Sequence, residues 1–200
     1  MNIIDLSVPF IEGRDVISKL QDNLPVYYGY QCYAYDLHIK SHRGTYFETS
    51  AHVFRDGKST ADVAVSDLVL PGYCMRYAAS DCCIRAEHFE KLLGNIAPNC
   101  AVLIDTGEDR TQYFSRDAAQ WLAAHNVKLM GSSTDGYDRG FVNPTGFFID
   151  LFKAEIPIIA NLTNLHLLPK ENFQIIVLPL KVTYVCTVPC RVITLINDSN

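Results

Sequence analysis

The segment "HRGTYFETSAH", residues 42–52, gathers two imidazoles, a phenol and a carboxylate at His42, Tyr46, Glu48 and His52. All four positions are even-numbered, so in an extended chain they project from one face. On a helix, His42 and Tyr46 would face away from Glu48 and His52. Gly44 and the neighbouring Thr and Ser residues favour an extended or turn conformation. We therefore predict an extended segment that lines one wall of a pocket, as a metal site, a metal-free acid/base pair or only a polar strand face.

The rest of the chain resembles an ordinary globular protein. Its 200 residues, with 48% hydrophobic and 20% charged side chains, predict one domain spanning residues 1–200 with a single core. The formal net charge of −5 and the lack of a Lys/Arg run argue against nucleic-acid and membrane-surface partners.

Two features of the sequence predict a cytoplasmic protein. The N-terminus "MNIIDLSVPF" has no signal-peptide pattern, and no window reaches the roughly eighteen apolar residues of a membrane span. The seven cysteines are odd in number, and we interpret most of them as small buried hydrophobic residues.

Hydrophobic periodicity predicts a mixed α/β fold that is rich in strands at both ends. Helices are expected within 85–95, 115–126 and 144–155, the last with Pro144 near its start. Buried strands are expected within 101–107, 127–131 and 156–162. The Tyr-rich segment 25–40 predicts one long strand or two short ones around Gly29, and "PG" at 71–72 predicts a turn.

The opening segment resembles the signature H-x-G-T-H-x-D-x-P-x-H of the cyclase family, also called the bacterial kynurenine formamidase-like family. Further resemblances are spread over nearly the whole chain: "IIDLSVPF", "VLIDTG", "LMGSSTDGYD", "IPIIANLTNLHLL" and "LPLKVTYVCTVPCRVITL". The resemblance implies the family's swivelling β/β/α domain. It also implies a homodimer or homotetramer with pockets near the subunit boundary.

The family's members generally bind one or two divalent metals, commonly zinc or manganese. By resemblance His42 matches a metal ligand, Glu48 replaces the bridging Asp, and His52 matches the general acid/base. Other expected donors are replaced, with Tyr46 and Phe148 at ligand His positions, Ala160 at a ligand Glu and Ser133 at an Asp. The resemblance therefore implies one weakly held metal on His42 and Glu48, with Asp135 or Asp138 as a further donor, or no metal.

We favour an enzyme, a hydrolase of a non-peptide C–N bond in an amide or N-formyl aryl amine, with His52 as general acid/base. One alternative is a metal-free lyase, dehydratase or cyclase that uses His52, Glu48 and Tyr46. The other is a non-catalytic small-molecule-binding protein on the same fold. Phe148 and Tyr46 are the expected substrate contacts, because they make the pocket wall apolar or aromatic.

Two other features are weaker candidates for the site. Arg43 could pair with a substrate carboxylate, but its odd register places it on the opposite face of an extended strand. The tyrosines of 27–35 could add aromatic surface to the pocket, although ordinary strand packing is the favoured interpretation.

Overall fold

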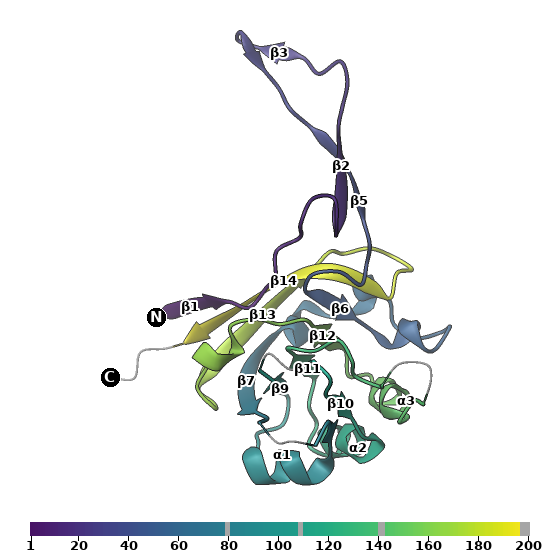
Figure 1. Ribbon diagram of the computed structural model, residues 1–200, viewed down its shortest axis with the longest axis vertical. Coiled ribbons are helices and arrows are strands. Elements are labelled where there is room, and N and C mark those ends of the chain that lie inside the picture. Colours follow the sequence, from purple (N-terminus) through teal and green to yellow (C-terminus); the bar gives the residue numbers. More distant parts are fainter. Residues whose placement is uncertain (79–80, 108–109, 140–142, 197–200) are drawn as a thin grey trace.

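The computed structural model describes residues 1–78, 81–107, 110–139 and 143–196, and its centre is one mixed sheet (Figure 1). The sheet has eight strands in the order β1-β14-β13-β7-β9-β11-β12-β6, and β6 also pairs with β14. Seven strands therefore close into a barrel-like ring, to which β1 is added along β14. The strands are β1 (Asn2–Asp5), β6 (Tyr46–Glu48), β7 (Val69–Arg76), β9 (Ala101–Asp105), β11 (Leu129–Ser132), β12 (Ile158–Ala160), β13 (Phe173–Pro179) and β14 (Thr187–Ile196).

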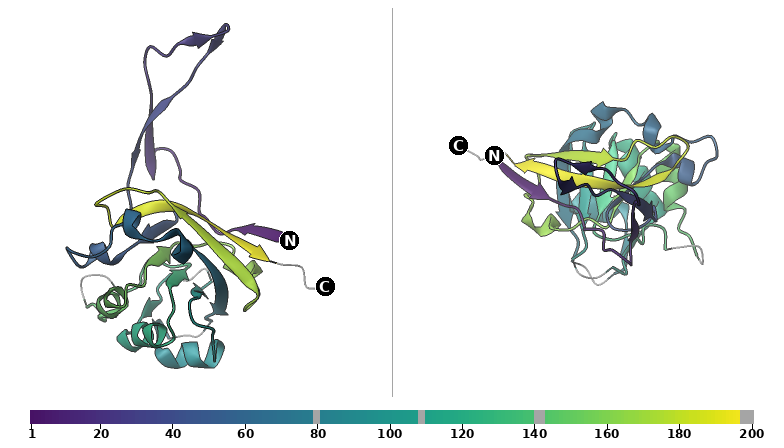
Figure 2. Two further views of the ribbon diagram at one scale, coloured as in Figure 1. Left: turned by 180° about the vertical axis from the view of Figure 1, so that it is seen from behind. Right: turned by 90° about the horizontal axis from the view of Figure 1, so that it is seen from above.

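The strands β7, β9, β11 and β12 are parallel, and helical crossovers connect them. The helices α1 (Ala86–Leu92), α2 (Arg116–Ala124) and α3 (Phe147–Lys153) lie together against one side of the sheet (Figures 1 and 2). Parallel strands need such crossovers. None of these described helices has the length and hydropathy of a membrane-spanning segment.

Alternating side chains of these strands enter two hydrophobic cores. Val102 and Ile104 pack toward the helices with Phe89, whereas Leu103 packs on the other face with Val192 of β14. A sheet covered on both faces explains why the central strands are continuous apolar runs in the sequence.

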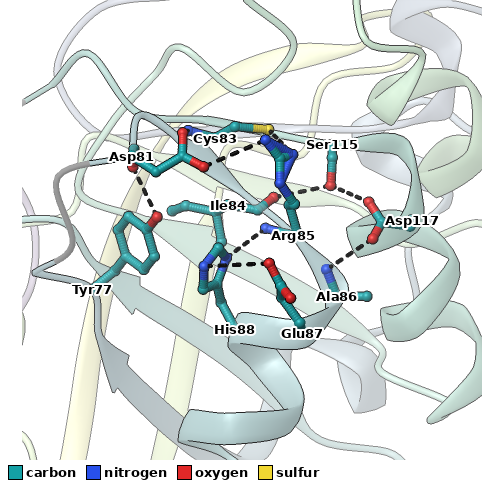
Figure 3. Close-up of polar contacts among 10 residues, drawn as sticks. All are labelled: Tyr77, Asp81, Cys83, Ile84, Arg85, Ala86, Glu87, His88, Ser115 and Asp117. Atoms are coloured by element: carbon teal, nitrogen blue, oxygen red, sulfur yellow. Dashed lines mark hydrogen bonds and ion pairs between the residues drawn. The ribbon is translucent and has the colours of Figure 1, made fainter.

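The starts of α1 and α2 are joined by hydrogen bonds (Figure 3). The Asp117 carboxylate, in the first turn of α2, accepts hydrogen bonds from the Ser115 hydroxyl and from the Ala86 backbone N–H at 3.2 Å. The Arg85 backbone N–H donates to His88 Nδ1 at 2.9 Å. These contacts satisfy N–H groups that have no partner within their own helix.

The mixed α/β prediction and the three predicted helices are confirmed. The third helix begins at Phe147, after Gly146, and not at Pro144. The predicted turn at residues 71–72 is wrong, because β7 continues through Pro71 and Gly72. A Cβ at Gly72 would lie 2.1 Å from Phe173 Cε2. Glycine at this position therefore leaves room for the aromatic ring of Phe173 on β13.

The Tyr-rich segment forms an arm that projects from the body of the molecule (Figures 1 and 2). The arm consists of β2 (Val16–Leu20) paired with β5 (Tyr35–Ile39), and β3 (Val26–Tyr27) paired with β4 (Tyr30–Gln31). Two short strands around Gly29 are as predicted, since Tyr28 and Gly29 both have the positive φ of a type I′ turn. Ordinary strand packing for its tyrosines is wrong: Tyr27, Tyr28, Tyr30, Tyr33 and Tyr35 are all exposed.

Candidate active site

The segment 42–52 is not extended throughout, so that part of the prediction is wrong. Residues 41–45 form a turn, β6 covers Tyr46–Glu48, and Ser50–His52 is a 3₁₀ turn. Gly44 has a φ of +58°, and the Thr45 hydroxyl accepts the Val8 N–H and donates to the Asn161 carbonyl. These bonds to distant parts of the chain take the place of strand pairing at residues 41–45.

The side chains nevertheless converge, and Glu48 is their meeting point. One carboxylate oxygen, Oε2, lies 2.8 Å from His42 Nε2 and 3.3 Å from His52 Nδ1. The same oxygen accepts a hydrogen bond of 2.9 Å from the Thr187 hydroxyl. Glu48 is only 2% exposed, so these partners stabilise a buried carboxylate.

Glu48 and burial shift the pKa values of His42 and Tyr46, the two groups beside it. The hydrogen bond to Glu48 raises the pKa of His42 above its usual value. Burial, together with the charges of Glu48 and Asp135, raises the pKa of the Tyr46 phenol well above its usual range. Tyr46 therefore stays a neutral hydrogen-bond donor at physiological pH and is a poor metal ligand.

The cluster fits one divalent cation. The donor atoms of His42, Glu48 and His52 all lie within 4.8 Å of one another, and no other such group occurs in the described part of the chain. Two His and one Glu form a ligand set found at catalytic zinc sites. Phe148 and Ala160 offer no donor atoms, so the donors for a second cation are lacking. The group also contains His52, which the family resemblance gives as the general acid/base and not as a ligand.

Phe148 lies beside the cluster, with its ring centroid 6.0 Å from that of His52, and Ala160 pairs with Tyr46 across β12 and β6. Asp138 instead accepts backbone N–H groups at the start of α3, including that of Gly146 at 3.0 Å. The Ser133 hydroxyl hydrogen-bonds Thr106. Asp138 and Ser133 thus have structural partners.

Arg43 and His42 line the same cleft, together with Asp135 and Arg110. The prediction that Arg43 lies on the opposite face from His42 is wrong. Side chains alternate between faces only in a strand, and Arg43 lies in a turn. Sequence reasoning also missed Thr187 and Asn161. Thr187 is 139 positions from Glu48, and no local pattern joins them.

Comparison with known proteins gives two matches in sequence. The family model "Putative cyclase" matches residues 4–139. Kynurenine formamidase from Salinibacter ruber (strain DSM 13855 / M31) is 26% identical over 174 residues, covering 78% of this chain and 77% of the relative.

Solved structures share the fold. Isatin hydrolase A from Labrenzia aggregata, bound to benzyl benzoate, superposes with a TM-score of 0.79 at 19% identity, covering 98% of this chain and 94% of the other. A structure titled as a potential metal-dependent hydrolase with cyclase activity gives a TM-score of 0.77 at 19% identity, covering 99% of each chain.

The fold and the signature segment define a cyclase-type α/β domain. The chain belongs to the cyclase family. The family resemblance drawn from the sequence is thereby confirmed.

Proposed function

We propose that this protein is a small-molecule hydrolase that cleaves a non-peptide C–N bond, in an amide or N-formyl aryl amine. The convergence of His42, His52 and Thr187 on the buried Glu48 carboxylate carries this proposal. The names of the relatives, kynurenine formamidase and isatin hydrolase, favour hydrolysis over a metal-free lyase or dehydratase and over a binding-only role.

In this proposal His42 and Glu48 would hold one zinc or manganese ion, and His52 stays unbound beside them as the general acid/base. When bound, such an ion supplies Lewis acidity toward a carbonyl oxygen and lowers the pKa of water. The neutral Tyr46 phenol donates a hydrogen bond to the oxygen that gains negative charge. His52 protonates the departing amine nitrogen, since it keeps a second ring nitrogen beside the one that faces Glu48. Phe148 provides apolar surface for an aryl group.

The test is hydrolysis of formanilide and isatin by purified protein, with zinc, with manganese and with chelator. We expect metal-dependent turnover that falls at least about a hundredfold in His52→Ala and in Glu48→Gln. His38→Ala, on the exposed arm, is the control and keeps full activity. Turnover that survives chelator but is lost in His52→Ala contradicts the metal-dependent mechanism and supports the metal-free alternative. No turnover with either metal contradicts the hydrolase.

We also propose that the protein is cytoplasmic and forms a homodimer or homotetramer. Cys74, Cys83 and Cys100 are buried as free thiols in the core, which suits a reducing compartment. The arm supports self-association, since a two-stranded ribbon alone in water is marginally stable.

A further inference from the structure

An open cleft of about 280 Å³ adjoins the candidate active site. Its walls include His42, Arg43, Arg110, Asp135 and the pair Arg14 and Asp15. It lies just beyond the carboxyl ends of the parallel strands β11 and β12, where ligands of α/β sheets generally bind. His42 belongs to both sites, because its Nε2 contacts Glu48 at 2.8 Å.

The charges of this cleft do not cancel. Arg14 and Asp15 neutralise each other through a contact of 2.7 Å. Across the described residues, neither Arg43 nor Arg110 forms an ion pair, and two carboxylates, Asp15 and Asp135, line the cleft with them. Among the described residues of the lining, three arginines thus face two carboxylates, an excess of one positive charge in a chain whose net charge is −5. Such a local excess attracts an anionic group.

Arg110 is held in position. Its carbonyl accepts a hydrogen bond from the Thr134 hydroxyl at 3.3 Å, and its guanidinium donates to Asn161 Oδ1 at 3.1 Å. Asn161 is only 8% exposed, and its Nδ2 donates to the Gly44 carbonyl at 3.1 Å. The buried amide thus joins Arg110 to the turn that carries His42. Within the described part of the chain Asn161 is the one acceptor of the guanidinium, so further N–H groups face the cleft, and a guanidinium matches the geometry of a carboxylate.

We propose that Arg43 and Arg110 bind a carboxylate of the substrate, which makes the preferred substrate an acyl aryl amine that carries an anionic group. This inference rests on the proposed hydrolase function and names the substrate class of that site. Because His42 separates the cleft from Glu48 by one imidazole ring, the carboxylate lies on the same small molecule as the bond that is cleaved.

The experiment compares kcat/KM for formanilide with that for 2-, 3- and 4-formamidobenzoate. We expect the wild type to prefer at least one formamidobenzoate by about tenfold, mainly through KM, as a charged hydrogen bond in an open cleft allows. Arg110→Gln and Arg43→Gln reduce that preference ratio, Arg110→Lys keeps part of it, and added salt weakens it. Arg55→Gln, an exposed arginine outside the cleft, is the matched control and keeps the wild-type ratio.

Binding without turnover separates this inference from the proposed function. Calorimetry compares 2-, 3- and 4-aminobenzoate with aniline in the wild type and in Arg110→Gln. Arg110-dependent aminobenzoate binding without hydrolysis of any formanilide supports the anion site and contradicts the hydrolase. Hydrolysis with equal preference for charged and neutral substrates overturns the anion site and leaves the hydrolase standing.

The cleft could instead bind the carboxylate product that hydrolysis releases from the acyl group. Inhibition by formate distinguishes product binding from substrate binding. If Arg110→Gln weakens formate inhibition but leaves the formamidobenzoate preference intact, the cleft binds the product and the proposal of a substrate subsite is wrong.

Discussion

At the scale of single residues, Glu48 organises the candidate site. It has one carboxylate oxygen toward two imidazoles and a hydroxyl, and it is almost fully buried. A buried carboxylate without partners is costly, so each of these contacts helps to stabilise and orient it. Thr187 is the one of these partners that is not a strong metal ligand. Its substitution therefore tests the orientation of the Glu48 carboxylate without removing a metal ligand.

Thr187→Val removes the hydroxyl that donates to Glu48 while nearly preserving the side-chain volume. Groups that orient a metal ligand typically affect affinity or activity by about 10–100-fold, and we expect a loss in that range for zinc affinity. Zinc titration with a competing chromophoric chelator measures it. The matched control is Thr194→Val in the same strand, because the Thr194 hydroxyl is buried without a hydrogen-bond partner among the described residues. Equal zinc affinity in the wild type and Thr187→Val would contradict the role.

At the scale of elements, the arm is an amphipathic ribbon. Its register places Ser18 opposite Leu37 and Leu20 opposite Tyr35 on one face, whereas Lys19 opposite Asp36 lies on the other. Leu37 is 60% exposed and Tyr35 is 54% exposed, so the apolar face has no cover in a single chain. A contact with a second copy of the chain is the proposed cover.

Leu20→Asp combined with Leu37→Asp places charge on this apolar face. We expect the mass measured by light scattering to fall toward that of a monomer, because burial of the charges in an interface is unfavourable. Lys19→Ala combined with Asp36→Ala changes the opposite face and serves as the control that keeps the wild-type mass. An unchanged mass for the double aspartate variant would show that the apolar face is not the contact.

The link between α1 and α2 gives a prediction on pH. Burial tends to raise the pKa of Asp117, but hydrogen bonds from Ser115 and from the Ala86 N–H outweigh it and lower the pKa. A lowered folded-state pKa stabilises the protein above the unfolded pKa, and this stability is lost as pH falls through the folded pKa.

Asp117→Asn should therefore lower the free energy of unfolding at pH 7 by about 1 kcal/mol, as the loss of a cap does. The difference from the wild type should shrink below the unfolded pKa of about 3.9. Urea unfolding at several pH values measures this, and Glu87→Gln in the first turn of α1 is the control. A difference that grows on acidification contradicts the assignment.

At the scale of the whole molecule, closure of the ring assembles the site. β6 pairs with β12 on one side and with β14 on the other, and Glu48 lies opposite both Ile158 and Thr187. The site is thus built from β6 in the first quarter of the chain and from β12 and β14 in its last quarter. A cation bound there should stabilise the entire fold, because the ligand set exists only when the chain is folded.

Zinc or manganese at a hundred times its dissociation constant should stabilise the fold by about 2.7 kcal/mol and raise the Tm by about 5–10 °C. Differential scanning calorimetry with metal and then with chelator measures the rise and its reversal. His42→Ala should lose the shift, and His38→Ala should keep it. A Tm that millimolar metal leaves unchanged would contradict the metal site.

The sequence by itself determined the elements with strong local signals. Ser115 precedes the second helix as predicted, the apolar run 101–107 contains β9, and the resemblance of 42–52 to the cyclase signature agrees with the family match. These features depend on side-chain periodicity and short-range hydrogen bonds, and residues close together in the sequence determine both.

Tertiary structure decided how the site is assembled. The turn at 41–45 places Arg43 beside His42, the ring of Phe173 makes Gly72 part of a strand, and the arm leaves its tyrosines exposed. Thr187 reaches Glu48 across 139 positions, and Asn161 reaches Gly44 across 117. Contacts at such separations arise from closure of the sheet, and the residues adjacent to each partner carry no signal of them.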